Sequence, residues 1–264
     1  MMPVQALIFD VDGTLADTEE LHRQAFNHAF CALGLDWNWD TALYGELLRV
    51  TGGKERIASY IARLRRSASE RDRLQRLVPE LHAIKTRRYR ELIELGQGRP
   101  RAGVLRLMRE ARQAGVRLAI ASTTSPENIE PLIRSGFGSD AMSWFGTIAT
   151  GDVVPAKKPA PDIYKFALAA LRVAPGRAIA IEDSAIGVQS AKAAGLFTLA
   201  TPSIWTREQD FSTADLVLGS LGDPDEPLAA ADQSRLGAQY LVLEGLVALH
   251  AASHFEGIAH GEAS

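Results

Sequence analysis

Apolar residues recur with two different periods along this chain, and the change of period divides the sequence. Residues 4–9 (VQALIF) form a short apolar run, typical of a strand that is buried on both faces. From Thr18 to about Glu94 the apolar residues instead recur every three or four positions, as on one face of a helix. The first helical stretch stops at Gly34. Because no convincing strand follows in this region, we expect an all-helical insert after the first strand.

The period changes again after the stretch GQGRPRAG, where helical patterns alternate with short apolar runs. This alternation predicts right-handed strand–helix–strand crossovers, and therefore an α/β fold with a doubly wound parallel sheet. The expected strands are VRLAIAS, FGTIAT, AIAIED, FTLAT and DLVLGS. The expected helices span about 103–113, 126–135, 161–171 and 186–194.

The domain organisation follows from these two patterns. We expect a catalytic core formed by residues 1–16 and 95–222, with residues 17–94 as a helical cap inserted into it. Residues 223–264 form a C-terminal extension, in which a helix is expected over about 233–252. That helix could pack on the core or mediate dimerisation, so a monomer or a weak homodimer is expected.

Composition places the 264 residues among ordinary globular proteins, with 46% hydrophobic and 23% charged residues. The net charge of −3 argues against nucleic acid as a partner. No apolar run is long enough to span a bilayer, and the N-terminus lacks the features of a signal peptide. We therefore expect a cytoplasmic protein without a membrane partner. The single cysteine, Cys31, cannot form an internal disulfide.

Polar side chains gather where the predicted strands end. In an open α/β sheet, ligands bind beyond the carboxyl ends of the strands, so these residues share one edge. Each feature has an ordinary explanation on its own, as a turn, a helix N-cap or a solvated loop charge. Their occurrence together, at successive strand ends, favours a common site. The residues are Asp10 and Asp12, Ser122 and Thr123, Glu182 and Asp183, with Lys158 in a nearby loop.

The carboxylates of this edge require compensation. Two carboxylates about 4 Å apart repel by roughly 4 kcal/mol at an effective dielectric constant of about 20. Either some of them bind protons or a hard cation neutralises them. Oxygen ligands of this kind suit Mg²⁺, and Lys158 would then face an anionic substrate.

Four segments, DVDGT, AIAST, KKPAPD and IEDSAIG, resemble the four motifs of the haloacid dehalogenase-like phosphatases, in order and with typical spacing. The resemblance covers about residues 5–220. It implies that Asp10 attacks phosphorus to form an aspartyl-phosphate, and that Asp12 protonates the leaving oxygen and later activates water. It also implies Mg²⁺ held by the Asp10 carboxylate, the Asp12 carbonyl and Asp183, with Glu182 nearby. The phosphate oxygens would be held by Ser122, Thr123 and Lys158.

The insert resembles the small cap of the branch that contains β-phosphoglucomutase, phosphoglycolate phosphatase and the CbbY-type phosphatases. TGGKERI, HAIKTRRY and STTSPENIE are most similar to the CbbY type, which hydrolyses xylulose-1,5-bisphosphate, an inhibitor of Rubisco. One departure is Asp17, where the resemblance leads us to expect Glu. The substrate contacts that the resemblance implies are Asp17, His22, Thr51, Gly52, Gly53, Lys54, His82, Lys85, Thr124, Ser125 and Asn128.

The chemistry of the cap agrees with an anionic substrate. Lys54 and Lys85 suit a second phosphate, and between Lys54 and Arg90 twelve Lys/Arg face four Asp/Glu. Many of these arginines are expected on solvated helix faces. The stretch TGGKE does not fit a nucleotide-binding loop, because the earlier glycine is missing and Glu55 follows the lysine. His22 could equally be a helix-surface residue.

The leading hypothesis is therefore a Mg²⁺-dependent phosphatase that acts on a small sugar phosphate, most specifically xylulose-1,5-bisphosphate. One alternative is a β-phosphoglucomutase-type isomerase, which would return the phosphoryl group to the sugar. Another is a broader phosphoglycolate or sugar-phosphate phosphatase. A non-catalytic phosphosugar sensor is disfavoured, because a pure binder gains nothing from the nucleophile Asp10.

Overall fold

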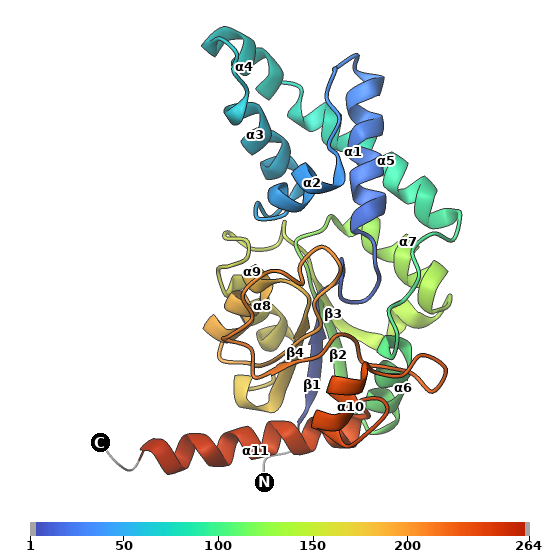
Figure 1. The fold of residues 1–264 in the computed structure, drawn as a ribbon, viewed down its shortest axis with the longest axis vertical. Coiled ribbons are helices and arrows are strands. Elements are labelled where there is room, and N and C mark those ends of the chain that lie inside the picture. Colours follow the sequence, from blue (N-terminus) through green and yellow to red (C-terminus); the bar gives the residue numbers. More distant parts are fainter. Residues whose placement is uncertain (1–3, 262–264) are drawn as a thin grey trace.

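The computed structural model describes residues 4–261, which build one six-stranded parallel sheet covered by helices. The strand order is β3-β2-β1-β4-β5-β6, so β1 lies in the middle of the sheet (Figure 1). All four residues of β1 are buried, as the apolar run predicted. The doubly wound α/β fold is confirmed. The strands are β1 (Ala6–Phe9), β2 (Arg117–Ala121), β3 (Phe145–Ala149), β4 (Ala178–Glu182), β5 (Phe197–Ala200) and β6 (Leu216–Val217).

The helices of the core cover both faces of the sheet. Leu7 and Phe9 point to one face, where they share a hydrophobic cluster with residues of α6 and α7. Ala6 and Ile8 point to the other face, against α8 and α9. These helices are α6 (Val104–Gln113), α7 (Pro126–Phe137), α8 (Asp162–Leu171) and α9 (Ala185–Ala193), with short 3₁₀ turns at Ala141–Trp144 and Pro175–Arg177.

The segment between β1 and α6 contains only helices among its regular elements and forms the expected cap. Its helices stand together above the sheet in Figure 1. The cap has its own hydrophobic cluster, in which Phe26, Phe30, Trp39 and Tyr44 are fully buried. The helices are α1 (Glu19–Ala32), α2 (Thr41–Leu47), α3 (Gly53–Arg63), α4 (Ala68–Gln75) and α5 (Val78–Glu94).

Two chain segments join the cap to the core and lie against each other. Ala16, in the outgoing segment, forms an isolated β-bridge with Pro100, in the returning one. The amide of Arg101 also donates to the carbonyl of Leu15 at 3.0 Å. The outgoing segment therefore leaves the end of β1 and enters the cap at a defined point.

The C-terminal extension differs from the prediction, because the expected helix over 233–252 is two helices, α10 (Ala230–Leu236) and α11 (Leu243–Gly261). Gly237 ends α10 in the left-handed conformation, with φ 65°. The amide of Leu241 then donates to the carbonyl of Leu221 at 2.9 Å. This contact with the core turns the chain between the two helices, which no local pattern reveals.

Along residues 4–261, none of the helices is at once long and apolar enough to cross a membrane.

Candidate active site

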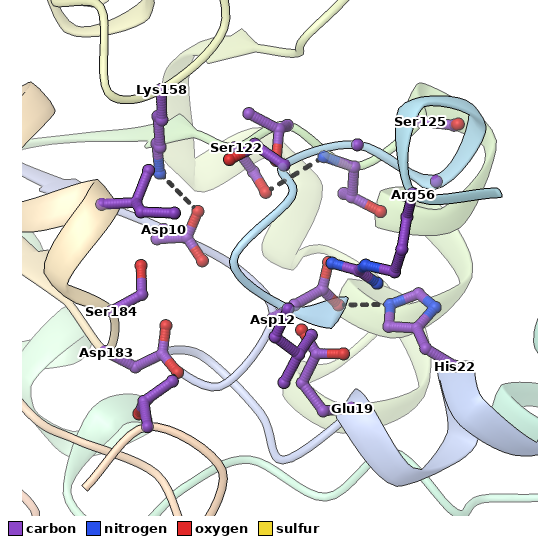
Figure 2. A pocket seen from close by; sticks show the side chains of 18 of the residues that line it. Asp10, Asp12, Glu19, His22, Arg56, Ser122, Ser125, Lys158, Asp183 and Ser184 are labelled. Carbon is purple, nitrogen blue, oxygen red and sulfur yellow. Dashed lines mark hydrogen bonds and ion pairs between the residues drawn. The ribbon is translucent and has the colours of Figure 1, made fainter. Parts of the chain in front are cut away.

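Asp10 and Glu182 meet at the carboxyl ends of β1 and β4, and Lys158 lies between them. Figure 2 shows the contact of Lys158 with Asp10. Phe9 and Ile181 are partners in the two paired strands, so Asp10 and Glu182 follow at the same level. The ammonium of Lys158 donates to Asp10 Oδ1 at 2.6 Å and to Glu182 Oε1 at 2.5 Å. All three side chains are almost completely buried.

Glu182 is held inside the core. It lies at the end of β4 with no exposed surface. Besides the contact with Lys158, Glu182 Oε1 accepts a hydrogen bond from the hydroxyl of Tyr164 at 2.6 Å. A carboxylate engaged in this way fixes the ammonium of Lys158 beside Asp10.

A group of three buried carboxylates provides the candidate metal centre. Oxygen atoms of Asp10, Glu182 and Asp183 lie within 4.8 Å of one another. Burial raises the pKa of Asp10 to about 7, with a further contribution from the charge of Glu182, although Lys158 opposes the change. Burial and the charges of Asp10 and Glu182 also raise the pKa of Asp183 well above its ordinary value.

One ammonium cannot balance three carboxylates, so the site favours either protons or a further cation. The available donors are all oxygen atoms, which suit a hard divalent cation such as Mg²⁺. The residues present therefore fit the expected metal. The resemblance implies the backbone carbonyl of Asp12, rather than its carboxylate, as a further ligand, and the Asp12 carboxylate lies outside this group of three described residues.

Gly13 allows the loop after β1 to approach Asp183. Its φ of +81° lies in the left-handed region, which strongly favours glycine. A Cβ atom at this position would stand 2.2 Å from Asp183 Oδ2. The glycine of the DVDGT motif is therefore required by the contact between two strand ends, as well as by the turn toward the cap.

The carboxylate of Asp12 turns toward the cap. Asp12 Oδ1 accepts hydrogen bonds from Thr18 Oγ1 at 2.6 Å and from His22 Nε2 at 2.8 Å. On the other side of the imidazole, Lys85 Nζ lies 2.5 Å from His22 Nδ1. An ammonium group can only donate, so Nδ1 accepts and Nε2 carries the proton that is donated to Asp12. Lys85, His22 and Asp12 therefore form one hydrogen-bonded chain from cap to core.

Neighbouring groups hold the Lys85–His22–Asp12 hydrogen-bonded chain in place and shift the pKa values of Lys85 and Asp12. The ring of His22 stacks on Tyr89, with centroids 4.0 Å apart and planes 6° from parallel. Burial lowers the pKa of Lys85 to about 8, although the charge of Asp12 opposes the change. Burial alone would raise the pKa of Asp12, but His22 and Thr18 hold it well below its ordinary value.

The loop after β2 supplies hydroxyl groups to the same site. Ser122, Thr123, Thr124 and Ser125 all line the cavity between core and cap. The amide of Thr124 donates to Ser122 Oγ at 3.4 Å, and Asn128 Nδ2 donates to Thr124 Oγ1 at 3.3 Å. Asn128 is buried behind the loop and does not line the cavity. Through this hydrogen bond Asn128 supports the loop.

The cavity lies between the strand ends and the cap. Most of the residues that the sequence predicted as site residues line it. These are Asp10, Asp12, His22, Thr51, Gly52, Gly53, His82, Lys85, Ser122, Thr123, Thr124, Ser125, Lys158 and Asp183.

Asp17 and Lys54 are not placed at the cavity. The carboxylate of Asp17 is 69% exposed and lies 3.5 Å from Arg101 Nε. Lys54 is exposed on α3, whereas Arg56, two positions later, is buried. Because two helical positions differ by about 200°, Lys54 and Arg56 point to nearly opposite sides of α3.

Arg56 and Glu19 line the cavity and were not predicted. The guanidinium of Arg56 donates to the hydroxyl of Tyr44 at 3.0 Å, and this hydroxyl donates to Glu19 Oε2 at 2.6 Å. Both side chains point into the space beside Asp12 in Figure 2. A signal for Arg56 was present in the sequence, because Arg56 shares a helix face with the apolar Tyr60 and adjoins Ile57.

A family profile described as haloacid dehalogenase-like hydrolase matches residues 4–195 of the chain. The chain is 47% identical over 220 residues to the protein CbbY of Cereibacter sphaeroides, covering 83% of this chain and 94% of the relative. It is 50% identical over 214 residues to CbbY of Rhodobacter capsulatus, covering 81% and 92% respectively.

Solved structures of related proteins are similar to this chain in fold. CbbY from Rhodobacter sphaeroides in complex with phosphate has a TM-score of 0.76 and 47% identity, over 82% of this chain and 94% of that one. A mutant of that protein has been solved with xylulose-1,5-bisphosphate, with the same TM-score and coverage. A β-phosphoglucomutase from Clostridium difficile, 23% identical over 82% of this chain and 91% of that one, shares the fold with a TM-score of 0.64.

Proposed function

The chain belongs to the haloacid dehalogenase-like hydrolases, and from this premise we propose that it is a Mg²⁺-dependent phosphatase whose substrate is xylulose-1,5-bisphosphate. The observation that carries the proposal is the position of two cations on opposite sides of one cavity. Lys158 lies beside Asp10 in the core, and Arg56 lines the same cavity from the cap. A sugar with a phosphate at each end matches this separation of charge.

Asp10 is the nucleophile in this proposal. One of its carboxylate oxygens attacks phosphorus, the bond from phosphorus to the sugar oxygen breaks, and an aspartyl-phosphate forms. A water molecule then attacks the same phosphorus, and the bond between Asp10 and phosphorus breaks to release inorganic phosphate. Lys158, fixed by Glu182, and the hydroxyl of Ser122 hold the phosphate oxygens in both steps.

Asp12 moves the protons of the two steps. It gives a proton to the leaving sugar oxygen in the first step and takes one from the attacking water in the second. The chain through His22 can supply the first proton: His22 passes its Nε2 proton to Asp12 and receives one from Lys85 on Nδ1. The proton that Asp12 takes from water returns by the same route to Lys85, so each turnover leaves Asp12, His22 and Lys85 in their starting states. Burial lowers the pKa of Lys85 to about 8, which makes it a readier proton donor than an exposed lysine.

The carboxylates of Asp10 and Asp183 and the backbone carbonyl of Asp12 would hold Mg²⁺. When bound, the ion neutralises the carboxylates and the charge that develops on the phosphoryl oxygens. Thr206, which donates to Asp183 Oδ2 at 3.3 Å, orients one of these ligands.

Arg56 selects the second phosphate in this proposal. It is only 9% exposed, and Tyr44 fixes its guanidinium by one hydrogen bond. A planar guanidinium suits bidentate binding of phosphate oxygens. His82, Thr51, Gly52 and Gly53 also line the cap side of the cavity. The CbbY relatives support the assignment, since one of them has been solved with xylulose-1,5-bisphosphate.

The test is phosphate release from a panel of substrates in the presence of Mg²⁺. We expect kcat/KM for xylulose-1,5-bisphosphate to exceed that for glycolate phosphate by about 30-fold or more, because only the bisphosphate reaches Arg56. Equal values would contradict the specific substrate and leave a broad phosphatase. Formation of glucose 6-phosphate from β-glucose 1-phosphate would identify an isomerase instead.

The variant Asp10→Asn tests the covalent step, since an amide oxygen cannot serve as the nucleophile. We expect release of inorganic phosphate to stop, and unchanged release would contradict the mechanism. We further propose that the enzyme acts in the cytoplasm and relieves inhibition of Rubisco. Calvin-cycle genes next to its own gene would support that role.

A further inference from the structure

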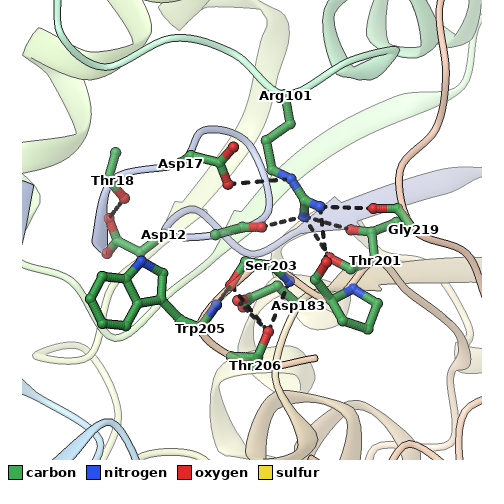
Figure 3. Close-up of polar contacts among 12 residues, drawn as sticks. Asp12, Asp17, Thr18, Arg101, Asp183, Thr201, Ser203, Trp205, Thr206 and Gly219 are labelled. Carbon is green, nitrogen blue, oxygen red and sulfur yellow. Dashed lines mark hydrogen bonds and ion pairs between the residues drawn. The ribbon is translucent and has the colours of Figure 1, made fainter. Parts of the chain in front are cut away.

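The loop that follows β5 forms part of the site and is fixed to the core at its base. The guanidinium of Arg101 donates to the carbonyl of Thr201 at 2.5 Å and to that of Pro202 at 3.1 Å (Figure 3). The same guanidinium also donates to the carbonyl of Gly13, next to Asp12. One buried arginine therefore ties this loop to the loop that carries the proposed catalytic aspartates.

The next residues of the loop form a tight turn that reaches Asp183. The amide of Ser203 donates to Thr206 Oγ1 at 2.9 Å, and the amide of Trp205 donates to Ser203 Oγ at 3.3 Å. Both Ser203 and Thr206 are 4% exposed. Because Thr206 Oγ1 donates to Asp183 Oδ2, the position of the whole turn is set relative to the proposed metal centre.

Trp205, at the tip of this turn, packs on the cap. Its indole lies edge-on to the ring of Tyr44, with centroids 5.4 Å apart and an interplanar angle of 85°. It is one of the partly buried residues that pack on the hydrophobic cluster of the cap. The neighbouring Ile204 instead is 75% exposed. Two adjacent residues of this core turn therefore make different contacts. Trp205 contacts the cap, and Thr206 contacts Asp183.

Tyr44 continues this contact into the cavity. Its hydroxyl accepts the hydrogen bond of Arg56 and donates to Glu19, and both of these residues line the cavity. The guanidinium of Arg56 also lies 5.3 Å from the centroid of the Tyr44 ring. Anything that fixes the ring of Tyr44 therefore fixes the cation that faces the sugar phosphate.

We propose that Trp205 is a positioning residue that latches the cap onto the core and so sets Arg56 for the second phosphate of the substrate. The proposal rests on the function proposed above. Among the described residues, no hydrogen bond or ring contact joins Trp205 to Asp10 or Asp12, so it acts on substrate preference rather than on the chemical step. A bisphosphate depends on the latch, whereas an aryl monophosphate such as p-nitrophenyl phosphate has no group for Arg56.

The test compares Trp205→Ala with Trp205→Phe and with Ile204→Ala, the matched change at the exposed neighbour. For Trp205→Ala we expect the KM for xylulose-1,5-bisphosphate to rise about tenfold, with kcat within a factor of about two. The KM for p-nitrophenyl phosphate should change less than about twofold. Trp205→Phe should restore most of the bisphosphate KM because it keeps a ring against Tyr44, and Ile204→Ala should match the wild type.

A rise of both KM values by the same factor in Trp205→Ala would overturn the proposal, since it would indicate a general structural defect. An unchanged KM for the bisphosphate would overturn it as well. These outcomes differ from failure of the proposed function, in which the wild-type enzyme itself would show no preference for the bisphosphate over monophosphates.

Discussion

The imidazole of His22, which the cap carries, donates a hydrogen bond of 2.8 Å to the carboxylate of Asp12, which belongs to the core. This contact joins α1 of the cap to the loop that follows β1. Burial alone would raise the pKa of Asp12, and His22 is the largest of the contacts that lower it below its ordinary value. The protonation state of Asp12 in the core therefore depends on a side chain that the cap supplies.

The variant His22→Gln separates hydrogen bonding from proton transfer. Its amide can still donate to Asp12, but it cannot accept a proton from Lys85 and pass one on. Because general acid–base catalysis typically contributes at least about 10²-fold, we expect kcat to fall by roughly that factor with a smaller change in KM. Steady-state kinetics with saturating Mg²⁺ measure both. The control is His28→Gln on the exposed face of the same helix, and a kcat within twofold of wild type for His22→Gln would exclude the relay.

Arg56 and Lys54 provide a matched pair of cations on α3, one buried at the cavity and one exposed. Arg56→Met removes a desolvated charge from the proposed phosphate site, a loss of about 2 kcal/mol or more. We therefore expect the KM for xylulose-1,5-bisphosphate to rise about 30-fold or more. Lys54→Met should raise it less than about threefold, because water and salt screen an exposed charge. Similar KM values for the two variants would be evidence against Arg56 as the phosphate ligand.

The sequence predicts the core of the site well because parallel strands share one carboxyl edge. Asp10, Asp183 and Lys158 follow buried apolar runs or lie in the loops beside them, so they meet whatever the order of the strands. The order itself, with β1 between β2 and β4, depends on long-range packing and was not predicted.

The cap side of the site could not be read from residue types alone. Lys54 was expected from the resemblance of TGGKERI and as a cation suited to phosphate, but in the structure Arg56 is the buried cation of α3, with its guanidinium over the ring of Phe26. Trp205 gave no signal, because it lies in an irregular loop whose path depends on Arg101, more than a hundred residues earlier in the chain. Such positions are set by tertiary contacts, which local periodicity does not record.

Removal of the metal should destabilise the protein, because the three buried carboxylates then repel one another. A ligand at about 100 times its dissociation constant stabilises the folded state by about 2.7 kcal/mol, which corresponds to roughly 5–10 °C in Tm for a chain of this size. We expect Mg²⁺ to raise Tm by this amount relative to EDTA in thermal unfolding of the wild type.

The variant Asp183→Asn tests whether the Mg²⁺-dependent rise in Tm depends on the carboxylate of Asp183. The variant lacks one of the repelling charges, so its Tm in EDTA should exceed that of the wild type, and Mg²⁺ should raise it by less than about 2 °C. Asp36→Asn, a change of an exposed carboxylate in the cap, should keep the full Mg²⁺ shift. A full shift in Asp183→Asn would place the metal elsewhere.

His82 predicts a specific dependence of stability on pH. Burial lowers its pKa from 6.5 to about 4, and the charges of Lys85 and Lys54 contribute while Glu55 opposes them. The unfolded chain therefore binds a proton at this residue below about pH 6.5, whereas the folded protein does so only near pH 4. The resulting stability is present above pH 6.5 and is lost as the pH falls to about 4.

The loss should amount to about 2 kcal/mol, because His82 is not completely buried. Urea unfolding of the wild type and of His82→Gln between pH 4 and pH 7.5 measures it as a difference, in which Asp10 and the other titrating groups largely cancel. We expect the wild type to lose stability relative to the variant as the pH falls, while His28→Gln, on an exposed helix face, follows the wild type. Parallel plots of unfolding free energy against pH for the wild type and His82→Gln would contradict this prediction. They would mean that His82 binds a proton as easily in the folded cap as in water. The cavity wall would then be more hydrated than the packing of His82 against Gly53 indicates.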